Sequence, residues 1–168
     1  MNNHAAGISI IAFIITVTAS MSYYQFVYTP EANAKPQLPE EILNPSEPAK
    51  VSILEGSALP SQPKNFDPKE IRGTLGISNK IIWTNGDTTA HTVSTDNQYN
   101  DQISGPFNSM DTIGLVLPQQ TYEFTFTKDG EYPYHCEPHP WMTGKVIIVK
   151  SFAYLLMIHF KYPFHSRD

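Results

Sequence analysis

The chain has a single cysteine, Cys136, among its 168 residues. One thiol excludes an intrachain disulfide, a Cys-x-x-Cys zinc site, a c-type haem attachment and a dinuclear copper centre built on two cysteines. The chain also lacks clustered positive charge, because its Lys and Arg residues are scattered singly and its formal net charge is −5. A nucleic-acid-binding protein would carry a basic patch, so we expect no nucleic acid among the partners.

Charged side chains are also missing from the 22 residues of 7–28, which are almost wholly apolar. A stretch of this length can cross a bilayer as a helix, so residues 1–28 are predicted to be a membrane anchor or a signal segment. A small-x-small pattern at Ala32-Asn33-Ala34 leaves secretion after cleavage near Ala34 as the alternative. The apolar run is long for a signal peptide and no positive charge precedes it, which favours an uncleaved single-pass anchor.

Residues 29–50 contain five prolines and four glutamates but few large aliphatic side chains. This composition predicts a semi-rigid, solvated linker. From Val51 onward the sequence changes to short alternating runs separated by Gly, Pro, Asn and Asp. That pattern predicts one all-β sandwich domain over residues 51–150, with no helix of ordinary length. Residues 151–168 would form a C-terminal tail of unknown role, either a short helix or an interfacial aromatic segment.

The last three expected strands lead to the most informative loop of the chain. In residues 121–127, Tyr and Phe alternate with Thr and Glu, which predicts a strand with one buried face. The next strand ends at Cys136, and the final strand covers residues 145–150. Pro133 lies inside the middle strand and cannot donate a hydrogen bond to a ladder. Its nitrogen must therefore face away from the ladder, or a bulge must occur there.

The loop itself reads Cys-Glu-Pro-His-Pro-Trp-Met from Cys136 to Met142. A thiolate, an imidazole and a thioether therefore follow one another at intervals of three residues, and these soft and borderline donors suit copper better than zinc, magnesium or calcium. Pro138 and Pro140 restrict their own φ and the ψ of the preceding residues, which predicts a stiff loop. The sequence thus predicts a metal site that includes Cys136, His139 and Met142.

A mononuclear site of this kind needs a second histidine. The domain offers His91 and His135 in addition to His139. Neighbouring residues on a strand point to opposite faces, so His135 is expected to point away from Cys136. This leaves His91, which follows an Asn-Gly-Asp turn, as the fourth member of the set.

Two segments resemble the small blue copper proteins. Residues 132–149 carry a short Cys-x-x-His-x-x-Met loop similar to that of the amicyanins, within the plastocyanin-like cupredoxins, and residues 81–93 resemble the first-histidine segment of the same family. The resemblance implies an all-β Greek-key sandwich of about eight strands that holds one type 1 copper per chain. The copper ion would cycle between Cu(I) and Cu(II).

By this resemblance His91, Cys136 and His139 are the strong ligands and Met142 is the weak axial ligand. Three places differ from the common family pattern. Thr92 stands where relatives commonly have an Asn that contacts the cysteine loop, Gln119-Gln120 stand where a glycine turn is common, and Pro133 replaces a residue that can donate a hydrogen bond. The resemblance therefore predicts the ligands and leaves open how Thr92 supports them.

The expected function is that of a membrane-tethered one-electron carrier and not of an enzyme, because a type 1 site has no open strong position for a substrate. The copper domain is expected on the extracytoplasmic side of the cell membrane. Membrane-associated redox proteins would be its partners, docking near His139 and Trp141 through an apolar patch. A core position is the alternative for Trp141.

Two other functions remain open. The first is a copper-dependent oxidoreductase subunit, like a nitrite reductase or multicopper oxidase, in which His135 beside the cysteine would bind a second copper. Against it, Glu137 breaks the His-Cys-His step of such enzymes, and the remaining histidines lie outside the domain, namely His4, His159 and His165. The second is a non-redox copper-binding protein, which would need ligands that open more easily than a proline-stiffened loop allows.

Overall fold

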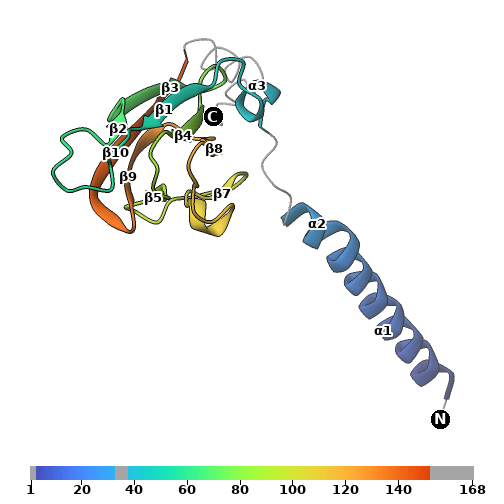
Figure 1. The fold of residues 1–168 in the computed structure, drawn as a ribbon. Coiled ribbons are helices and arrows are strands. Elements are labelled where there is room, and N and C mark those ends of the chain that lie inside the picture. The colour runs from blue at the N-terminus through green and yellow to red at the C-terminus, as the bar shows by residue number, and fades with distance from the viewer. Residues whose placement is uncertain (1–2, 33–37, 152–168) are drawn as a thin grey trace. The chain divides into compact units, whose positions relative to one another are not determined.

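The computed structural model describes residues 3–32 and 38–151 (Figure 1). The chain divides into two compact units, Met1–Pro36 and Gln37–Asp168, which we describe separately. Asn33 and Ala34 of the small-x-small pattern lie outside the described residues. The same holds for the C-terminal tail from residue 152 onward.

The first unit is helical. It consists of α1 (Asn3–Tyr23), the π-helical turn η1 (Tyr24–Tyr28) and α2 (Thr29–Ala32). Within it, Ile10–Tyr28 is long and apolar enough to cross a membrane, and none of it is buried. The hydroxyls of Thr16 and Thr18 donate to the carbonyls of Ala12 and Ile14 at 2.8 and 2.9 Å, so these two side chains do not depend on water. Membrane anchors and signal sequences share such a helix.

The second unit includes part of the expected linker. Ile42 in the short helix α3 (Glu40–Leu43) is 1% exposed and packs in the hydrophobic core. The side-chain nitrogen of Asn79 donates to the carbonyl of Ile42 at 2.8 Å and to that of Phe126 at 2.9 Å. The part of residues 29–50 around Ile42 therefore belongs to the folded unit and not to the solvated linker that composition predicts. A proline-rich composition does not reveal that one of its few aliphatic side chains fills a core position.

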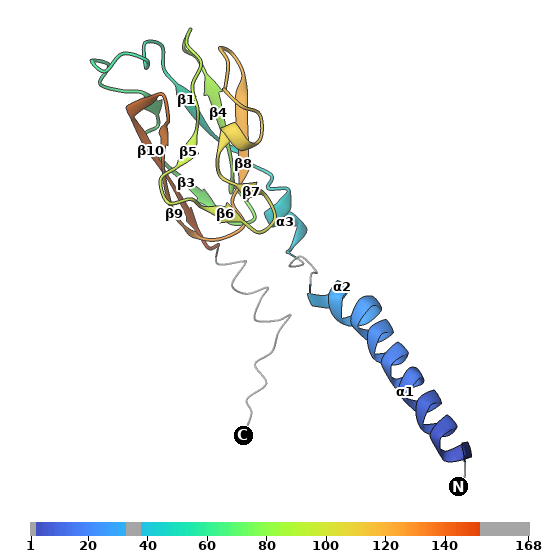
Figure 2. The same cartoon turned by 90° about the horizontal axis from the view of Figure 1, so that it is seen from below.

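The strands of the described domain are β1 (Ala49–Ile53), β2 (Phe66–Asp67), β3 (Glu70–Thr74), β4 (Lys80–Asn85), β5 (Ser94–Thr95), β6 (Asn100–Asp101), β7 (Gly105–Pro106), β8 (Thr121–Thr125), β9 (Gly130–Cys136) and β10 (His139–Val149). They form two four-stranded sheets, ordered β2-β1-β4-β8 and β3-β10-β9-β5, and a β6-β7 hairpin. The chain passes repeatedly from one sheet to the other, so the predicted sandwich is confirmed (Figure 2). The strands number ten and not about eight, because four of them have two residues each.

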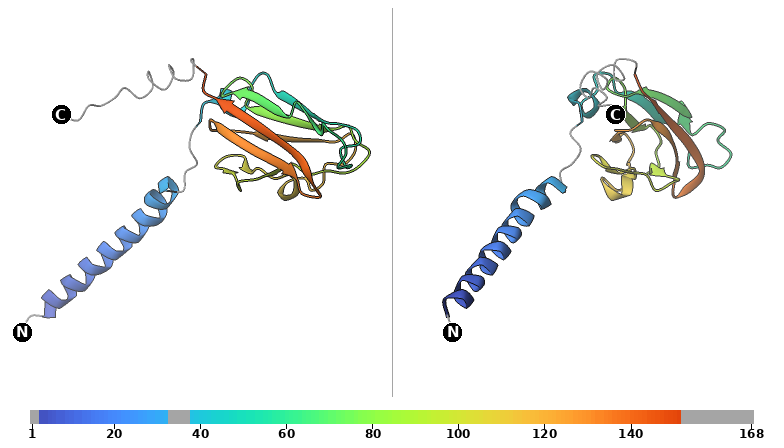
Figure 3. Two further views of the ribbon diagram at one scale, coloured as in Figure 1. Left: turned by 90° about the vertical axis from the view of Figure 1, so that its left-hand side faces the viewer. Right: turned by 180° about the vertical axis from the view of Figure 1, so that it is seen from behind.

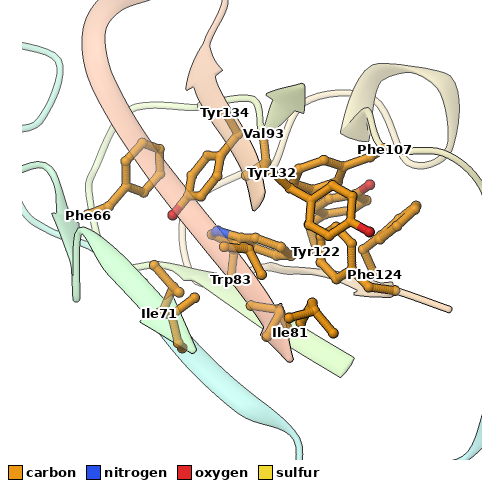
Figure 4. Close-up of a cluster of buried hydrophobic side chains, with 14 of the residues drawn as sticks. Phe66, Ile71, Ile81, Trp83, Val93, Phe107, Tyr122, Phe124, Tyr132 and Tyr134 are labelled. Atoms are coloured by element: carbon orange, nitrogen blue, oxygen red, sulfur yellow. The ribbon is translucent and has the colours of Figure 1, made fainter. Parts of the chain in front are cut away.

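Aromatic side chains fill the space between the sheets (Figure 4). Trp83 of β4 is fully buried, and its ring lies 5.5 Å from that of Phe107, 5.6 Å from Tyr122 and 5.5 Å from Tyr134. Tyr134 also packs across Gly144, where a β-carbon would lie 2.3 Å from the tyrosine ring. Only glycine fits at this crossing, which lies two residues from Cys136 on β9 and two from Met142 on β10. The loop between β9 and β10 therefore stands on a closely packed base.

Pro133 lies in β9 without disturbing the ladder. The register with β10 runs unbroken through the pair Pro133–Lys145, and the irregularity comes later, between His139 and Thr143. The carbonyl of Pro133 accepts from the N–H of Asp96 at 3.0 Å, on the side of β5. The nitrogen and carbonyl of one strand residue face the same neighbour, so the missing N–H faces the short β5 edge. The structure therefore shows a nitrogen that faces away from the β10 ladder and not a bulge at Pro133.

Gln119 takes the place of a turn glycine. Its φ is 65°, in the left-handed region that glycine occupies most easily. Its N–H donates to the carbonyl of Asn85 at 2.8 Å. The turn before β8 therefore forms with a non-glycine residue and supports the end of β4.

The two ends of the sandwich carry different features (Figure 3). At one end β4 ends at Asn85, shortly before His91, and β9 ends at Cys136, where the turn into β10 brings in His139 and Met142. At the opposite end Asn79, just before β4, binds α3, and the carbonyl of Val149 accepts from the N–H of Leu75 at 2.9 Å. The described domain thus begins and ends away from the loops that carry the predicted site.

Candidate metal centre

Three of the four predicted ligands meet at one end of the sandwich. The ligand atoms of His91, Cys136 and His139 all lie within 4.8 Å of one another. The Sγ atom of Cys136 is 3.6 Å from Nδ1 of His91 and 3.5 Å from Nδ1 of His139. His91 and Cys136 are fully buried, whereas His139 is partly exposed. One imidazole of the group therefore reaches the surface.

Cys136 and His139 come together through a tight turn. They form a direct pair between β9 and β10, with Glu137-Pro138 as the two residues between them. The predicted loop is shorter than expected, because β10 already begins at His139 and not at residue 145. Met142 follows in the irregular stretch of β10 and is fully buried in the core cluster. Its burial is compatible with an axial position, which stays a prediction.

His91 is held by its backbone and by its ring. Its N–H and carbonyl pair with Val116 at 3.1 and 2.8 Å. The side chain of Asn85 donates to the carbonyls of Thr89 and Val116 at 2.8 and 2.9 Å and so ties the turn before His91 to the same segment. On the ring, Nε2 lies 2.9 Å from Oδ2 of the buried Asp87. The other nitrogen, Nδ1, faces Cys136.

The charge state of Asp87 determines which nitrogen of His91 is available. Burial by itself raises the pKa of the Asp87 carboxyl, but hydrogen bonds from His91, Gly56, Thr88 and Ala58 outweigh it and lower the pKa to about 2. Burial lowers the pKa of His91, and the facing Asp87 offsets this only in part. An ionised carboxylate only accepts hydrogen bonds, so Nε2 of the neutral imidazole carries the proton. Nδ1 is left with a free lone pair directed at the site.

Thr92 makes the contact across to the cysteine loop. Its N–H donates to Sγ of Cys136 at 3.3 Å, and its hydroxyl oxygen accepts from the N–H of Glu137 at 2.8 Å. Burial raises the pKa of the Cys136 thiol, and both the N–H and the hydroxyl of Thr92 act in the opposite direction. The residue that differs from the common family pattern therefore still joins the two ligand loops.

His135 lies apart from this group. Its ring nitrogen Nδ1 pairs with the carboxylate of Asp96, and both side chains are partly exposed. In the ladder His135 faces Ser94 of β5. The alternation along β9 thus sends His135 to the surface and Cys136 to the interior.

Comparison with known proteins identifies the family. The family model of copper binding proteins of the plastocyanin/azurin type matches residues 59–149. The chain belongs to this family. Amicyanin of Paracoccus denitrificans is 32% identical over 73 residues, which make up 43% of this chain and 50% of that protein. Amicyanin-alpha of Methylorubrum extorquens is 36% identical over 84 residues, or 49% of this chain and 63% of that protein.

The chain therefore spans between half and two thirds of these curated relatives. Among solved structures, a purple cupredoxin from Nitrosopumilus maritimus is 23% identical, covers 60% of this chain and 99% of its own, and has a TM-score of 0.48.

The donors of this cupredoxin domain fit copper, the metal that the family binds. Two imidazole nitrogens and one thiolate are the strong donors that a type 1 site uses. Ligand atoms held about 2.0 to 2.3 Å from one ion lie roughly 3.5 Å apart, and the sulfur–nitrogen distances of 3.6 and 3.5 Å agree with this spacing. The site residues can therefore hold one copper ion with little rearrangement.

Sequence reasoning missed Asp87 and the segment 56–58 that binds it. Asp87 lies four residues before His91, but in an Asn-Gly-Asp turn an Asp has a sufficient structural explanation. The alternative of a core position for Trp141 is wrong, because this side chain is 37% exposed. Its Nε1 donates to the carbonyl of Ser57 at 3.0 Å, and its ring lies 5.4 Å from that of His139.

Proposed function

We propose that this protein is a membrane-tethered one-electron carrier with one type 1 copper held by His91, Cys136 and His139 and weakly by Met142. The observation that carries the proposal is the close approach of two imidazole nitrogens to one buried thiol in a member of a copper-binding family. When bound, copper supplies the one-electron change between Cu(II) and Cu(I). The chain supplies the donors and keeps water away from them.

Several features of the chain favour a carrier over an enzyme. The backbone of His91 is paired with Val116, and Sγ of Cys136 accepts a hydrogen bond from Thr92, so contacts within the chain itself hold both donors. Two imidazoles, a thiolate and a buried thioether fill the positions of a type 1 site and leave no strong position for a substrate. A preorganised site of this kind suits rapid electron exchange.

We assign the exit for the electron to His139. This ring is the partly exposed one, and the partly exposed Trp141 packs beside it. Apolar side chains on neighbouring loops are exposed as well, namely Leu59, Leu115 and Leu117. The backbone bridge between His91 and Val116 places residues 115–117 next to the site. We assign the docking of redox partners to this apolar surface, since a small patch is enough for a transient encounter.

The charges around this surface favour a partner with a basic rim. Neither residues 81–127 nor residues 129–144, which include both ligand loops, contain a Lys or Arg. Exposed acidic side chains do occur on the loops of this end, at Glu55, Asp111 and Glu137. Complementary charge speeds diffusional encounter and orients the partners. A basic redox protein should therefore associate faster than an acidic one.

The helical unit supports the tether. Its apolar stretch can span a membrane, and the hydroxyls of Thr16 and Thr18 are satisfied within the helix. Aromatic side chains gather at its C-terminal end, namely Tyr23, Tyr24, Phe26 and Tyr28, as in the aromatic belts at membrane interfaces. The domain begins and ends away from the ligand loops, so a tether would leave the site free. We place the domain on the extracytoplasmic side.

The test uses the full chain in detergent, loaded with Cu(II). The expected result is one copper per chain, an intense visible thiolate-to-copper band and a reversible one-electron couple. Reduced protein should then pass its electron to a basic haem protein without turning over nitrite or oxygen by itself. A colourless copper adduct, or more than one copper per chain with multiple turnover, would overturn the proposal.

A further inference from the structure

We propose that Asp87 is a positioning residue of the copper site: it fixes the orientation of His91 and places an uncompensated negative charge beside the metal. We further infer that residues 56–58 join the supports of both histidine ligands. Both inferences rest on the proposed copper site.

Asp87 is surrounded by donors of hydrogen bonds. Its Oδ1 accepts from the N–H of Thr88 at 2.7 Å and of Gly56 at 3.1 Å, and its Oδ2 accepts from His91 at 2.9 Å and Ala58 at 3.3 Å. Only 3% of the residue is exposed. These four donors are neutral N–H groups, and the hydroxyl of Thr88, 3.5 Å from Oδ1, is also uncharged. Among the described residues no Lys or Arg forms an ion pair with Asp87. The carboxylate is therefore well solvated by the protein and keeps its full charge.

This charge acts on the metal through one imidazole ring. The two nitrogens of His91 have different partners, because Nε2 faces Asp87 while Nδ1 faces Cys136. A carboxylate behind a metal-bound histidine fixes the tautomer and the ring orientation and makes the histidine a stronger donor. Its charge also favours the more positive oxidation state, and a buried site screens this effect only weakly. Asp87 should therefore stabilise Cu(II) over Cu(I).

Residues 56–58 connect Asp87 to the other side of the site. The N–H groups of Gly56 and Ala58 both point at Asp87, while the carbonyl of Ser57 between them accepts from Trp141 at 3.0 Å. Ser57 is fully buried, and its hydroxyl lies 2.6 Å from the carbonyl of Leu54. The Trp141 ring in turn packs against His139. Three consecutive residues thus hold one neighbour of each histidine ligand.

The charge is tested by Asp87→Asn in the full-length, copper-loaded protein. An Asn side chain can still accept the His91 hydrogen bond, so the visible band should remain while the charge is lost. At the midpoint potential of the parent protein, the Cu(I) to Cu(II) ratio should rise at least tenfold, which equals 59 mV for a one-electron couple. Asp111→Asn is the matched control, since it removes an exposed charge at the same end. The control should change the ratio less than twofold.

The orientation is tested in metal-free protein by nitrogen NMR of the His91 ring. The parent protein and Asp87→Asn should show Nε2 protonated, whereas Asp87→Ala should show a mixture of tautomers. If Asp87→Asn keeps the band but leaves the ratio within twofold of the parent value, the charge inference is overturned. If Asp87→Ala retains a single tautomer, the orientation inference is overturned. Absence of the band in the parent protein would instead overturn the proposed function.

The connection through residues 56–58 is tested by Trp141→Phe. This change keeps an aromatic ring beside His139 and removes the N–H that Ser57 accepts. Amide hydrogen exchange at Gly56 and Ala58 should accelerate at least tenfold, with Leu59→Ala, an exposed neighbour, as the control. Unchanged exchange in Trp141→Phe would show that the two sides are held independently.

Discussion

The two histidines of the candidate centre are held in different ways. His91 is fully buried, paired with Val116 through its backbone and bound to Asp87 through its ring. His139 follows a two-residue turn, is partly exposed and packs against a partly exposed Trp141. A site that must keep its geometry and still exchange electrons needs both conditions. The buried side therefore maintains the geometry, and the exposed side is where a partner can approach.

The largest expected effect on the copper site comes from changing Cys136, whose thiol faces both histidines. Cys136→Ser should abolish the intense visible band of the Cu(II) protein, because that band requires a thiolate donor. His135→Gln is the control, since this ring faces Asp96 at the surface and not the metal group. Absorption spectra of copper-loaded samples give the result. Loss of the band in His135→Gln would mean that the neighbour of Cys136 takes part in the site.

Exposure predicts a difference between His139→Gly and His91→Gly. Both variants should lose most of the visible band at equal copper loading. Added imidazole should restore the band in His139→Gly, because the space opens to solvent, but not in His91→Gly, where the space is enclosed. Titration with imidazole, followed by absorption, measures the difference. Equal recovery in both variants would break the comparison between a buried and an exposed histidine.

A change at the opposite end should affect stability and leave both histidines as they are. Ile42→Ala removes a side chain that is 1% exposed and should lower the free energy of unfolding by about 2–4 kcal/mol. Ile77→Ala, at a residue 42% exposed, should change it by less than about 0.5 kcal/mol. Denaturant unfolding and the visible spectrum are measured together. A shifted band in Ile42→Ala would show that α3 influences the metal site.

The smallest expected effect concerns the approach of a partner to the exposed side. The double change Glu55→Gln and Asp111→Asn removes two exposed acidic groups and should slow electron transfer to a basic haem protein about two- to fivefold at low salt. The difference should disappear near 0.5 M salt, because screening then shortens electrostatic range to roughly a few ångströms. Stopped-flow rates at several salt concentrations provide the measurement. A double variant that is as fast as the parent protein, or faster, at low salt would contradict docking of a basic partner here.

Much of the fold follows from local patterns. The alternation in β8 and the run ending at Cys136 predict strands with one buried face, and both are present. The short strands β2, β5, β6 and β7 have two residues each, too few for any periodicity to register. Ile42 lies in a proline-rich stretch whose composition indicates solvent exposure. Its burial depends on the core cluster that it joins and on Asn79, 37 residues further along the chain.

The sequence by itself determined the class of the domain and a candidate ligand set. The alternation of apolar and polar residues indicates which face of a strand is buried, and the Cys-x-x-His-x-x-Met spacing indicates which donor atoms lie in one loop. Only the tertiary structure decided how those donors are supported. Asp87, Thr92 and Trp141 bind partners that are distant in the chain or whose roles a turn or a core position would explain equally well. No local sequence pattern indicates the hydrogen bond between Asp87 and Gly56, which are 31 residues apart, or the one between Trp141 and Ser57, which are 84 residues apart. They exist only once the sheets have packed and brought these loops to one end of the sandwich.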